Sequence, residues 1–68
     1  RKIVSLEKSF HILIVDDDVK NIFVLDSALA QYDANVITAF NGQEAIDILK
    51  EDKTIDIVLM DIMMPVMD

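Results

Sequence analysis

The sequence predicts an α/β domain in which a three-stranded parallel sheet is built in the order β-α-β-α-β. Two runs of consecutive apolar residues, at positions 12–15 and 57–60, are typical of strands buried on both faces of such a sheet. Between these runs, apolar residues recur at three- and four-residue steps, which is the spacing of amphipathic helices. A chain of 68 residues forms one domain at most, so we expect these elements to belong together.

The composition is that of an acidic, folded segment. Hydrophobic residues make up 53% of the chain, which is too many for a disordered segment. The net charge of −7 argues against nucleic acid as a partner and is compatible with a bound cation or a basic partner surface. No cysteine is present, so disulfides and thiolate metal ligands are excluded. No apolar run approaches the ~20 residues that span a membrane, and charges interrupt the apolar residues near the start, unlike in a signal peptide. We therefore expect this segment to contact neither nucleic acid nor a membrane.

The first part of the chain is expected to contain a linker, a strand and a helix. Residues 1–10 mix charged and apolar side chains, and we interpret them as a linker or the end of an upstream element. Residues 11–15 are expected to form the first strand. Asp18 is a suitable N-cap for a helix that begins at Val19. The apolar stripe of this helix is expected to consist of Ile22, Leu25, Leu29 and Tyr32, widened by Phe23 and Val24.

The middle of the chain repeats this order. Residues 33–35 have the composition of a turn, and residues 36–39 are expected to form a short second strand. Asn41 is expected to cap a second helix, with Glu44 completing a capping box three residues later. The inward stripe of that helix is expected to consist of Gly42, Ala45, Ile46 and Leu49.

The predicted topology brings acidic residues together. The third strand, at residues 57–60, runs into Asp61 much as the first runs into Asp16 and Asp17. If the strands lie in the order 2-1-3, right-handed crossovers place the two helices on opposite faces of the sheet. The first and third strands then meet at a topological switch point, and their C-terminal ends frame a crevice. We therefore expect the three carboxylates to converge there, provided that the third strand pairs with the first.

Such a group of carboxylates favours a hard divalent cation. Mg²⁺ prefers oxygen ligands and typically binds one or two carboxylates together with phosphate oxygens. A carboxylate beside Mg²⁺ can also attack a phosphoryl group, because the metal offsets the repulsion between the two anions. Asp16, Asp17 and Asp61 therefore predict a magnesium site with phosphoryl chemistry.

Three motifs carry a specific resemblance to a known family. They are Val15-Asp16-Asp17, residues 41–45 (NGQEA) and residues 56–68 (DIVLMDIMMPVMD). Together they resemble the receiver domain of two-component response regulators, and most of all the receivers attached to hybrid sensor histidine kinases. The resemblance covers residues 11–68 and implies part of a flavodoxin-like doubly wound fold with strand order 2-1-3.

The resemblance also implies roles for individual residues. Asp61 would be the phosphoacceptor, taking a phosphoryl group from a phosphohistidine of a histidine kinase or histidine phosphotransfer domain. Asp17 would bind Mg²⁺ directly, and Asp16 would bind it directly or through water. The backbone carbonyl of Met63 would supply a further ligand, and Pro65 would shape the loop after the acceptor. The resemblance thus implies a cytoplasmic phosphoacceptor domain of a phosphorelay rather than an enzyme.

The chain differs from the family in its extent. A receiver has five strands, and this sequence stops after the third, so we expect a truncated receiver. The hydroxyl residue that ends strand 4 and the lysine that ends strand 5 have no counterpart here. A receiver fragment that binds partners without phosphoryl chemistry is therefore an alternative. The third strand would become a sheet edge, and we expect self-association through this edge.

A phosphatase of the haloacid dehalogenase type is a rival from another class. Residues 12–19 resemble the start of its motif, with an apolar strand followed by Asp-x-Asp and then by Val19. Asp16 would then be the nucleophile and Asp18 the general acid, and phosphate monoesters would be turned over. His11 begins the first strand with no visible partner, so we expect it to have no role in metal binding.

Overall fold

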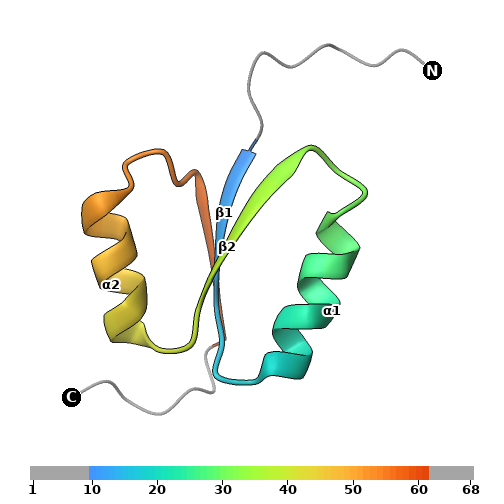
Figure 1. Cartoon of the computed structure of the whole chain (residues 1–68), viewed down its shortest axis with the longest axis horizontal. Helices are drawn as coiled ribbons and strands as arrows, with labels where there is room; N and C mark the ends of the chain where they lie inside the picture. Colours follow the sequence, from blue (N-terminus) through green and yellow to red (C-terminus); the bar gives the residue numbers. More distant parts are fainter. Residues whose placement is uncertain (1–9, 62–68) are drawn as a thin grey trace.

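The computed structural model describes residues 10–61, which form a parallel sheet with one helix on each face (Figure 1). The elements are β1 (Phe10–Val15), α1 (Val19–Leu29), β2 (Ala34–Ala39), α2 (Gly42–Glu51) and β3 (Ile57–Met60). The strands lie in the order β2-β1-β3 and all run parallel. This confirms the predicted β-α-β-α-β order, the strand order 2-1-3 and the helices on opposite faces.

β1 is the central strand and supplies most of the core. Its residues pair with β2 on one side and with β3 on the other, so that Val15 lies opposite both Ala39 and Met60. Leu13, Ile14 and Val15 are completely buried. The consecutive apolar residues of β1 are explained by this position, because alternate side chains point to opposite faces and both faces are covered.

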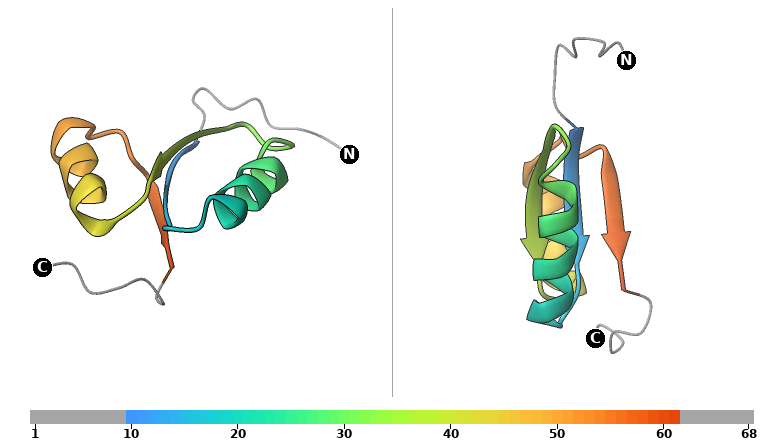
Figure 2. Two further views of the ribbon diagram at one scale, coloured as in Figure 1. Left: turned by 60° about the horizontal axis from the view of Figure 1, so that its bottom comes forward. Right: turned by 90° about the vertical axis from the view of Figure 1, so that its right-hand side faces the viewer.

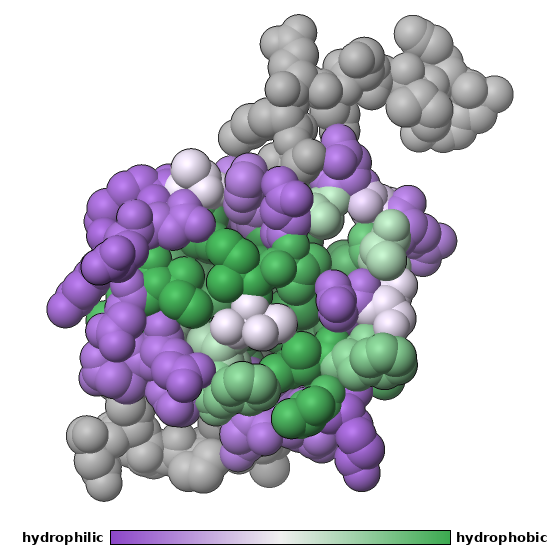
Figure 3. Space-filling model, in the orientation of Figure 1, coloured by the Kyte–Doolittle hydropathy of each residue, from purple (hydrophilic) through white to green (hydrophobic). Residues whose placement is uncertain are grey.

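Each face of the sheet has its own apolar cluster. Leu13 and Val15 pack with Ala39 and Ala45 on the side of α2. Ile12 and Ile14 pack with Ile22 on the side of α1, where Leu25 and Leu29 are half-buried against them. In the face shown in Figure 3, hydrophobic side chains gather between the two helices. Hydrophilic side chains cover the outer side of α2, whereas hydrophobic side chains also reach the rim on the side of α1.

Both helices begin at the residues that the sequence predicts. The Asp18 carboxylate accepts a hydrogen bond from the Lys20 amide at 2.9 Å, and Asn41 accepts one from the Glu44 amide at 2.8 Å. The Glu44 carboxylate accepts a hydrogen bond from the backbone N–H of Phe40 at 2.8 Å. The capping box therefore forms, although its reciprocal hydrogen bond reaches the residue before the N-cap.

The predicted stripe of α1 is wrong in part. Phe23, Val24 and Tyr32 are exposed, at 69%, 62% and 65% of their surface. The helix ends at Leu29, so Tyr32 lies beyond it. Within the described residues, the sheet beneath α1 has only three strands, and Ile22, Leu25 and Leu29 are enough to cover the part that α1 reaches.

Other boundaries and burial also differ from expectation. β1 begins one residue earlier than expected, at Phe10, and β2 begins at Ala34 inside the expected turn. β3 is 37–52% exposed at each of its four residues rather than buried on both faces. The reason is its place at the edge of the sheet, beside the part that the helices cover (Figure 2). In the part of the chain that the structure describes, neither helix is long and apolar enough to cross a membrane.

Candidate acidic metal centre

Asp16 continues β1 beyond its last paired residue. Its backbone N–H donates to the carbonyl oxygen of Ala39 at 3.0 Å, which extends the ladder between β1 and β2. Its side chain is only 4% exposed, and one of its carboxylate oxygens accepts a hydrogen bond from the Asp18 N–H at 2.9 Å. This hydrogen bond supports the negative charge at a buried position. Asp17 is exposed in the bend that follows.

Asp61 reaches the same place from β3. Its backbone N–H donates to the carbonyl oxygen of Val15 at 3.0 Å, so the pairing of β1 and β3 continues to this residue. Because Val15 lies opposite Met60, Asp61 lies level with Asp16. Its side chain is half-buried.

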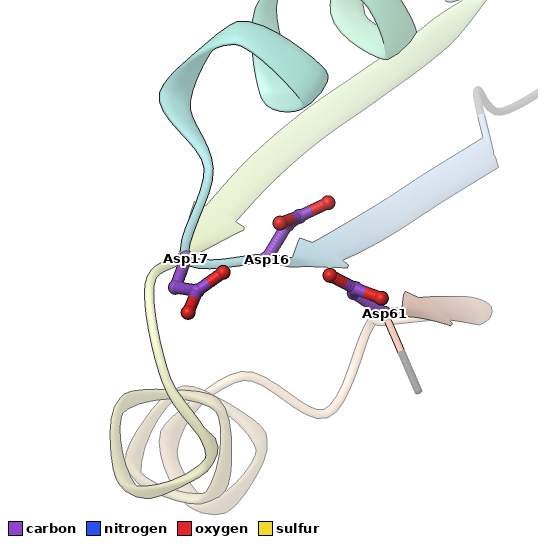
Figure 4. A group of neighbouring side chains, drawn as sticks. All are labelled: Asp16, Asp17 and Asp61. Atoms are coloured by element: carbon purple, nitrogen blue, oxygen red, sulfur yellow. The ribbon is translucent and has the colours of Figure 1, made fainter. Parts of the chain in front are cut away.

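The three carboxylates converge as the sequence predicts. One oxygen each of Asp16, Asp17 and Asp61 lies within 4.8 Å of the others. Figure 4 shows the side chains meeting at the C-terminal ends of β1 and β3. Two residues with expected roles lie outside the described residues. They are Met63, whose backbone carbonyl is expected to be a ligand, and Pro65, which is expected to shape the loop after Asp61.

The donor set of this site fits Mg²⁺. All three side chains offer carboxylate oxygens, which are the ligands that this hard cation prefers. Their mutual repulsion would be relieved by a bound cation. Asp18 stands apart from this group: its carboxylate is engaged by the Lys20 amide at the start of α1. Its role as an N-cap is confirmed.

A cavity of about 310 Å³ adjoins the carboxylates. Asp16 and Asp61 stand at one side of it, and the apolar side chains of β1, β3 and α1 form most of its remaining wall. Asn21, in the first turns of α1, is a further polar residue in the wall. The crevice expected at the switch point between β1 and β3 is therefore present.

His11 has partners in the structure that the sequence does not reveal. The backbone N–H of His11 donates a hydrogen bond to the Asp56 carboxylate at 2.9 Å, and the backbone carbonyl oxygen of His11 accepts one from the backbone N–H of Asp56 at 2.8 Å. Its ring Nδ1 lies 3.5 Å from the Thr54 hydroxyl oxygen. Sequence reasoning missed these contacts because they join residues more than forty positions apart. They lie at the start of β1, away from the acidic site.

Thr54 also organises the loop before β3. Its hydroxyl and its backbone N–H both donate to the Asp52 carboxylate. These hydrogen bonds hold the pKa of Asp52 below its usual value, and the one from the hydroxyl has the largest effect. The electrostatic interaction with His11 lowers the pKa further. The loop is thus held by local hydrogen bonds close to β1.

The fold and the site together define a class of protein, namely a doubly wound α/β domain with an acidic cluster at its switch point. The profile of the response regulator receiver domain matches residues 12–68. The chain therefore belongs to the response regulator receiver family of two-component signalling.

Known relatives agree with this assignment. The chain is 42% identical over 64 residues to "Probable histidine kinase 3" of Oryza sativa subsp. japonica, covering 94% of this chain and 6% of that protein. It is 47% identical over 57 residues to "Histidine kinase 3" of Arabidopsis thaliana, covering 84% of this chain and 6% of that protein. It is 40% identical over 65 residues to "Transcription factor SKN7" of Saccharomyces cerevisiae, covering 96% of this chain and 10% of that protein. The chain thus spans a small part of each of these relatives. No solved structure matches it significantly.

Proposed function

We propose that this domain accepts a phosphoryl group on Asp61, with Mg²⁺ bound at Asp16, Asp17 and Asp61, as the receiver of a two-component phosphorelay. The convergence of one oxygen from each carboxylate within 4.8 Å carries this proposal. Membership in the receiver family supports it, because the family implies histidine kinases or histidine phosphotransfer domains as partners.

Each carboxylate has a separate role in the proposal. Asp17 is exposed and is assigned as a direct ligand of Mg²⁺. Asp16 has one oxygen engaged by the Asp18 N–H and is assigned as a ligand through its other oxygen, directly or through water. The backbone carbonyl of Met63 is proposed as a further ligand. When bound, Mg²⁺ supplies positive charge that offsets the repulsion between the acceptor carboxylate and the incoming phosphoryl oxygens.

The proposed reaction is a phosphoryl transfer between two side chains. A carboxylate oxygen of Asp61 attacks the phosphorus of a phosphohistidine, and a P–O bond forms as the P–N bond breaks. The electron pair of the broken bond remains on the imidazole nitrogen, which takes up a proton from solvent. The products are an aspartyl phosphate and a free histidine side chain, so in this proposal the domain acts as a phosphoacceptor rather than as an enzyme. The receiver family supports the cytoplasm as its proposed location.

Two alternatives predict other outcomes. In the interaction-only alternative, the domain binds its partners and no phosphoryl group reaches Asp61. The phosphatase alternative requires Asp18 as a general acid. That carboxylate is already engaged in capping α1 and is not part of the acidic cluster, which argues against this alternative.

Incubation of the 68-residue chain with acetyl phosphate and Mg²⁺, followed by intact-mass analysis, separates the acceptor role from the interaction-only role, and a phosphate-release assay with a phosphate monoester tests the phosphatase. We expect one phosphoryl adduct, which is lost in Asp61→Asn and retained in Asp26→Asn, a matched change on the exposed surface of α1. The absence of any adduct would favour the interaction-only role. Release of many phosphates per chain from a phosphate monoester would favour the phosphatase.

We also propose that the 68-residue chain self-associates through β3. This strand is at the edge of the described sheet, and Ile57, Val58, Leu59 and Met60 are all apolar and exposed. An exposed apolar edge strand offers both unpaired backbone groups and hydrophobic surface to a second chain.

A further inference from the structure

We propose that Asp56 is a positioning residue for Asp61. Its hydrogen bonds to His11 hold the start of β3 against β1 in the register that brings Asp61 beside Asp16. The inference rests on the proposed function only in treating Asp61 as the acceptor. The geometry of the hydrogen bonds between Asp56 and His11 is independent of that role.

Asp56 makes two hydrogen bonds with one residue of β1. Its backbone N–H donates to the His11 carbonyl oxygen at 2.8 Å, and its carboxylate accepts the His11 N–H at 2.9 Å. Both lie just before Ile57, the first residue of β3, which pairs with Ile12. The side chain therefore adds a charge-assisted hydrogen bond where the strand begins.

The described structure restrains the register of β3 at few other points, one being Ile55, which is partly buried against the cluster around Leu13. The strand has four residues, pairs with β1 alone, and is exposed at every position. Register is normally specified by a buried face, and a short strand that is only about half-buried is less firmly held in register. A slip of one residue would move Asp61 by ~3.3 Å along the strand and turn its side chain to the other face.

The equal lengths of the two segments carry the effect of the Asp56–His11 hydrogen bonds to the other end of the strands. Equally many residues separate His11 from Asp16 and Asp56 from Asp61. Pairing Asp56 with His11 therefore places Asp61 level with Asp16, where the Asp61 N–H donates a hydrogen bond to the Val15 carbonyl oxygen. The contact between Asp56 and His11 thus acts on the acidic site from the opposite end of the sheet.

The preceding loop supports the same attachment. Thr54 is hydrogen-bonded to Asp52 in the loop, and its hydroxyl oxygen lies 3.5 Å from His11 Nδ1. The backbone and the ring of His11 therefore both face the segment that leads into β3. The loop cannot shift along β1 without giving up these contacts.

The test compares Asp56→Ala with Asp56→Asn in the 68-residue chain. Asp56→Ala removes the acceptor of the His11 N–H, whereas Asp56→Asn keeps an oxygen at that position. Asp47→Ala is the matched control, because Asp47 is an exposed acid on α2 whose carboxylate accepts only a local hydrogen bond from Gln43 among the contacts described. The measurements are amide hydrogen exchange at His11 and Asp61, and Mg²⁺ affinity by titration.

We expect the amides of His11 and Asp61 to exchange faster together in Asp56→Ala, and Mg²⁺ to bind ~10-fold more weakly, as when an orienting contact is removed from a metal ligand. Asp56→Asn should fall between Asp56→Ala and the original chain, and Asp47→Ala should match the original chain. If Asp56→Ala does not fold, Asp56→Asn is compared with the original chain, and both amides should again accelerate.

Faster exchange at His11 with unchanged exchange at Asp61 would overturn the proposal, because Asp56 would then stabilise only its own end of β3. Unchanged Mg²⁺ affinity in folded Asp56→Ala would do the same. A different result tests the function itself: if the original chain binds no Mg²⁺ and takes up no phosphoryl group, the proposed function fails. The exchange measurement at Asp61 still decides the role of Asp56 in that case.

Discussion

Asp17→Asn should stabilise the fold without Mg²⁺ and abolish the stabilisation that Mg²⁺ provides. Three carboxylate oxygens lie within 4.8 Å of one another, so each pair of charges repels. For two unit charges at this separation the repulsion is about 3.5 kcal/mol at an effective dielectric constant of ~20 and about 1 kcal/mol in bulk water. Because Asp17 is exposed, the value near that of water applies, and screening by salt reduces it further.

The free energy of unfolding is measured by urea denaturation, with a chelator and with saturating Mg²⁺. Without Mg²⁺, we expect Asp17→Asn to be more stable than the original chain by on the order of 1 kcal/mol. With Mg²⁺ at ~100 times its dissociation constant, the original chain should gain about 2.7 kcal/mol, and the variant should gain little. The order of stability should therefore invert between the two conditions.

Asp26→Asn is the control for this measurement, since it removes a charge of the same sign from an exposed position of α1 outside the acidic cluster. It should leave the gain in Mg²⁺ unchanged. The reasoning is refuted if Asp17→Asn keeps the full gain in Mg²⁺, or if it is less stable than the original chain when Mg²⁺ is absent.

Three further predictions concern the caps, the loop and the sheet edge. Asp18→Ala removes the N-cap of α1 and should lower the free energy of unfolding by about 1 kcal/mol in urea denaturation, whereas an unchanged value would argue against the cap. The lowered pKa of Asp52 means that its hydrogen bonds stabilise the fold above the usual pKa of an aspartate and lose this effect as pH falls through the lowered value. Thr54→Val should raise that pKa towards the usual range, as followed by NMR titration, and no change would show that Thr54 is not its cause. Val58→Lys should weaken self-association in sedimentation experiments, and a strictly monomeric original chain at high concentration would contradict the role assigned to β3.

The part of the site that was predictable from sequence depended on strand order. Asp16 and Asp17 follow one apolar run and Asp61 follows another, and parallel strands place their C-terminal ends at the same edge. Their convergence needed only that β3 pair with β1, which it does. The helix starts were equally predictable, because a capping side chain and the amide it binds are neighbours in sequence.

The features that were not predictable depend on what lies across the sheet. Phe23 and Val24 extend the apolar stripe of α1 but are exposed. The spacing of apolar residues along a helix does not show how many of them the sheet will bury. The apolar run of β3 is typical of a strand buried on both faces, but its burial depends on neighbours that the run itself does not encode. The contact between His11 and Asp56 joins two distant segments and leaves no local pattern.

Mapping the phosphorylated residue tests the central claim most directly. After reaction with acetyl phosphate and Mg²⁺, borohydride reduction converts an aspartyl phosphate into homoserine, which tandem mass spectrometry locates in the sequence. The proposed role of Asp61, which follows from membership in the receiver family, predicts homoserine at position 61 and nowhere else in the chain. Homoserine at position 16 or 17, or none at all, would contradict the assignment of Asp61 as the phosphoacceptor.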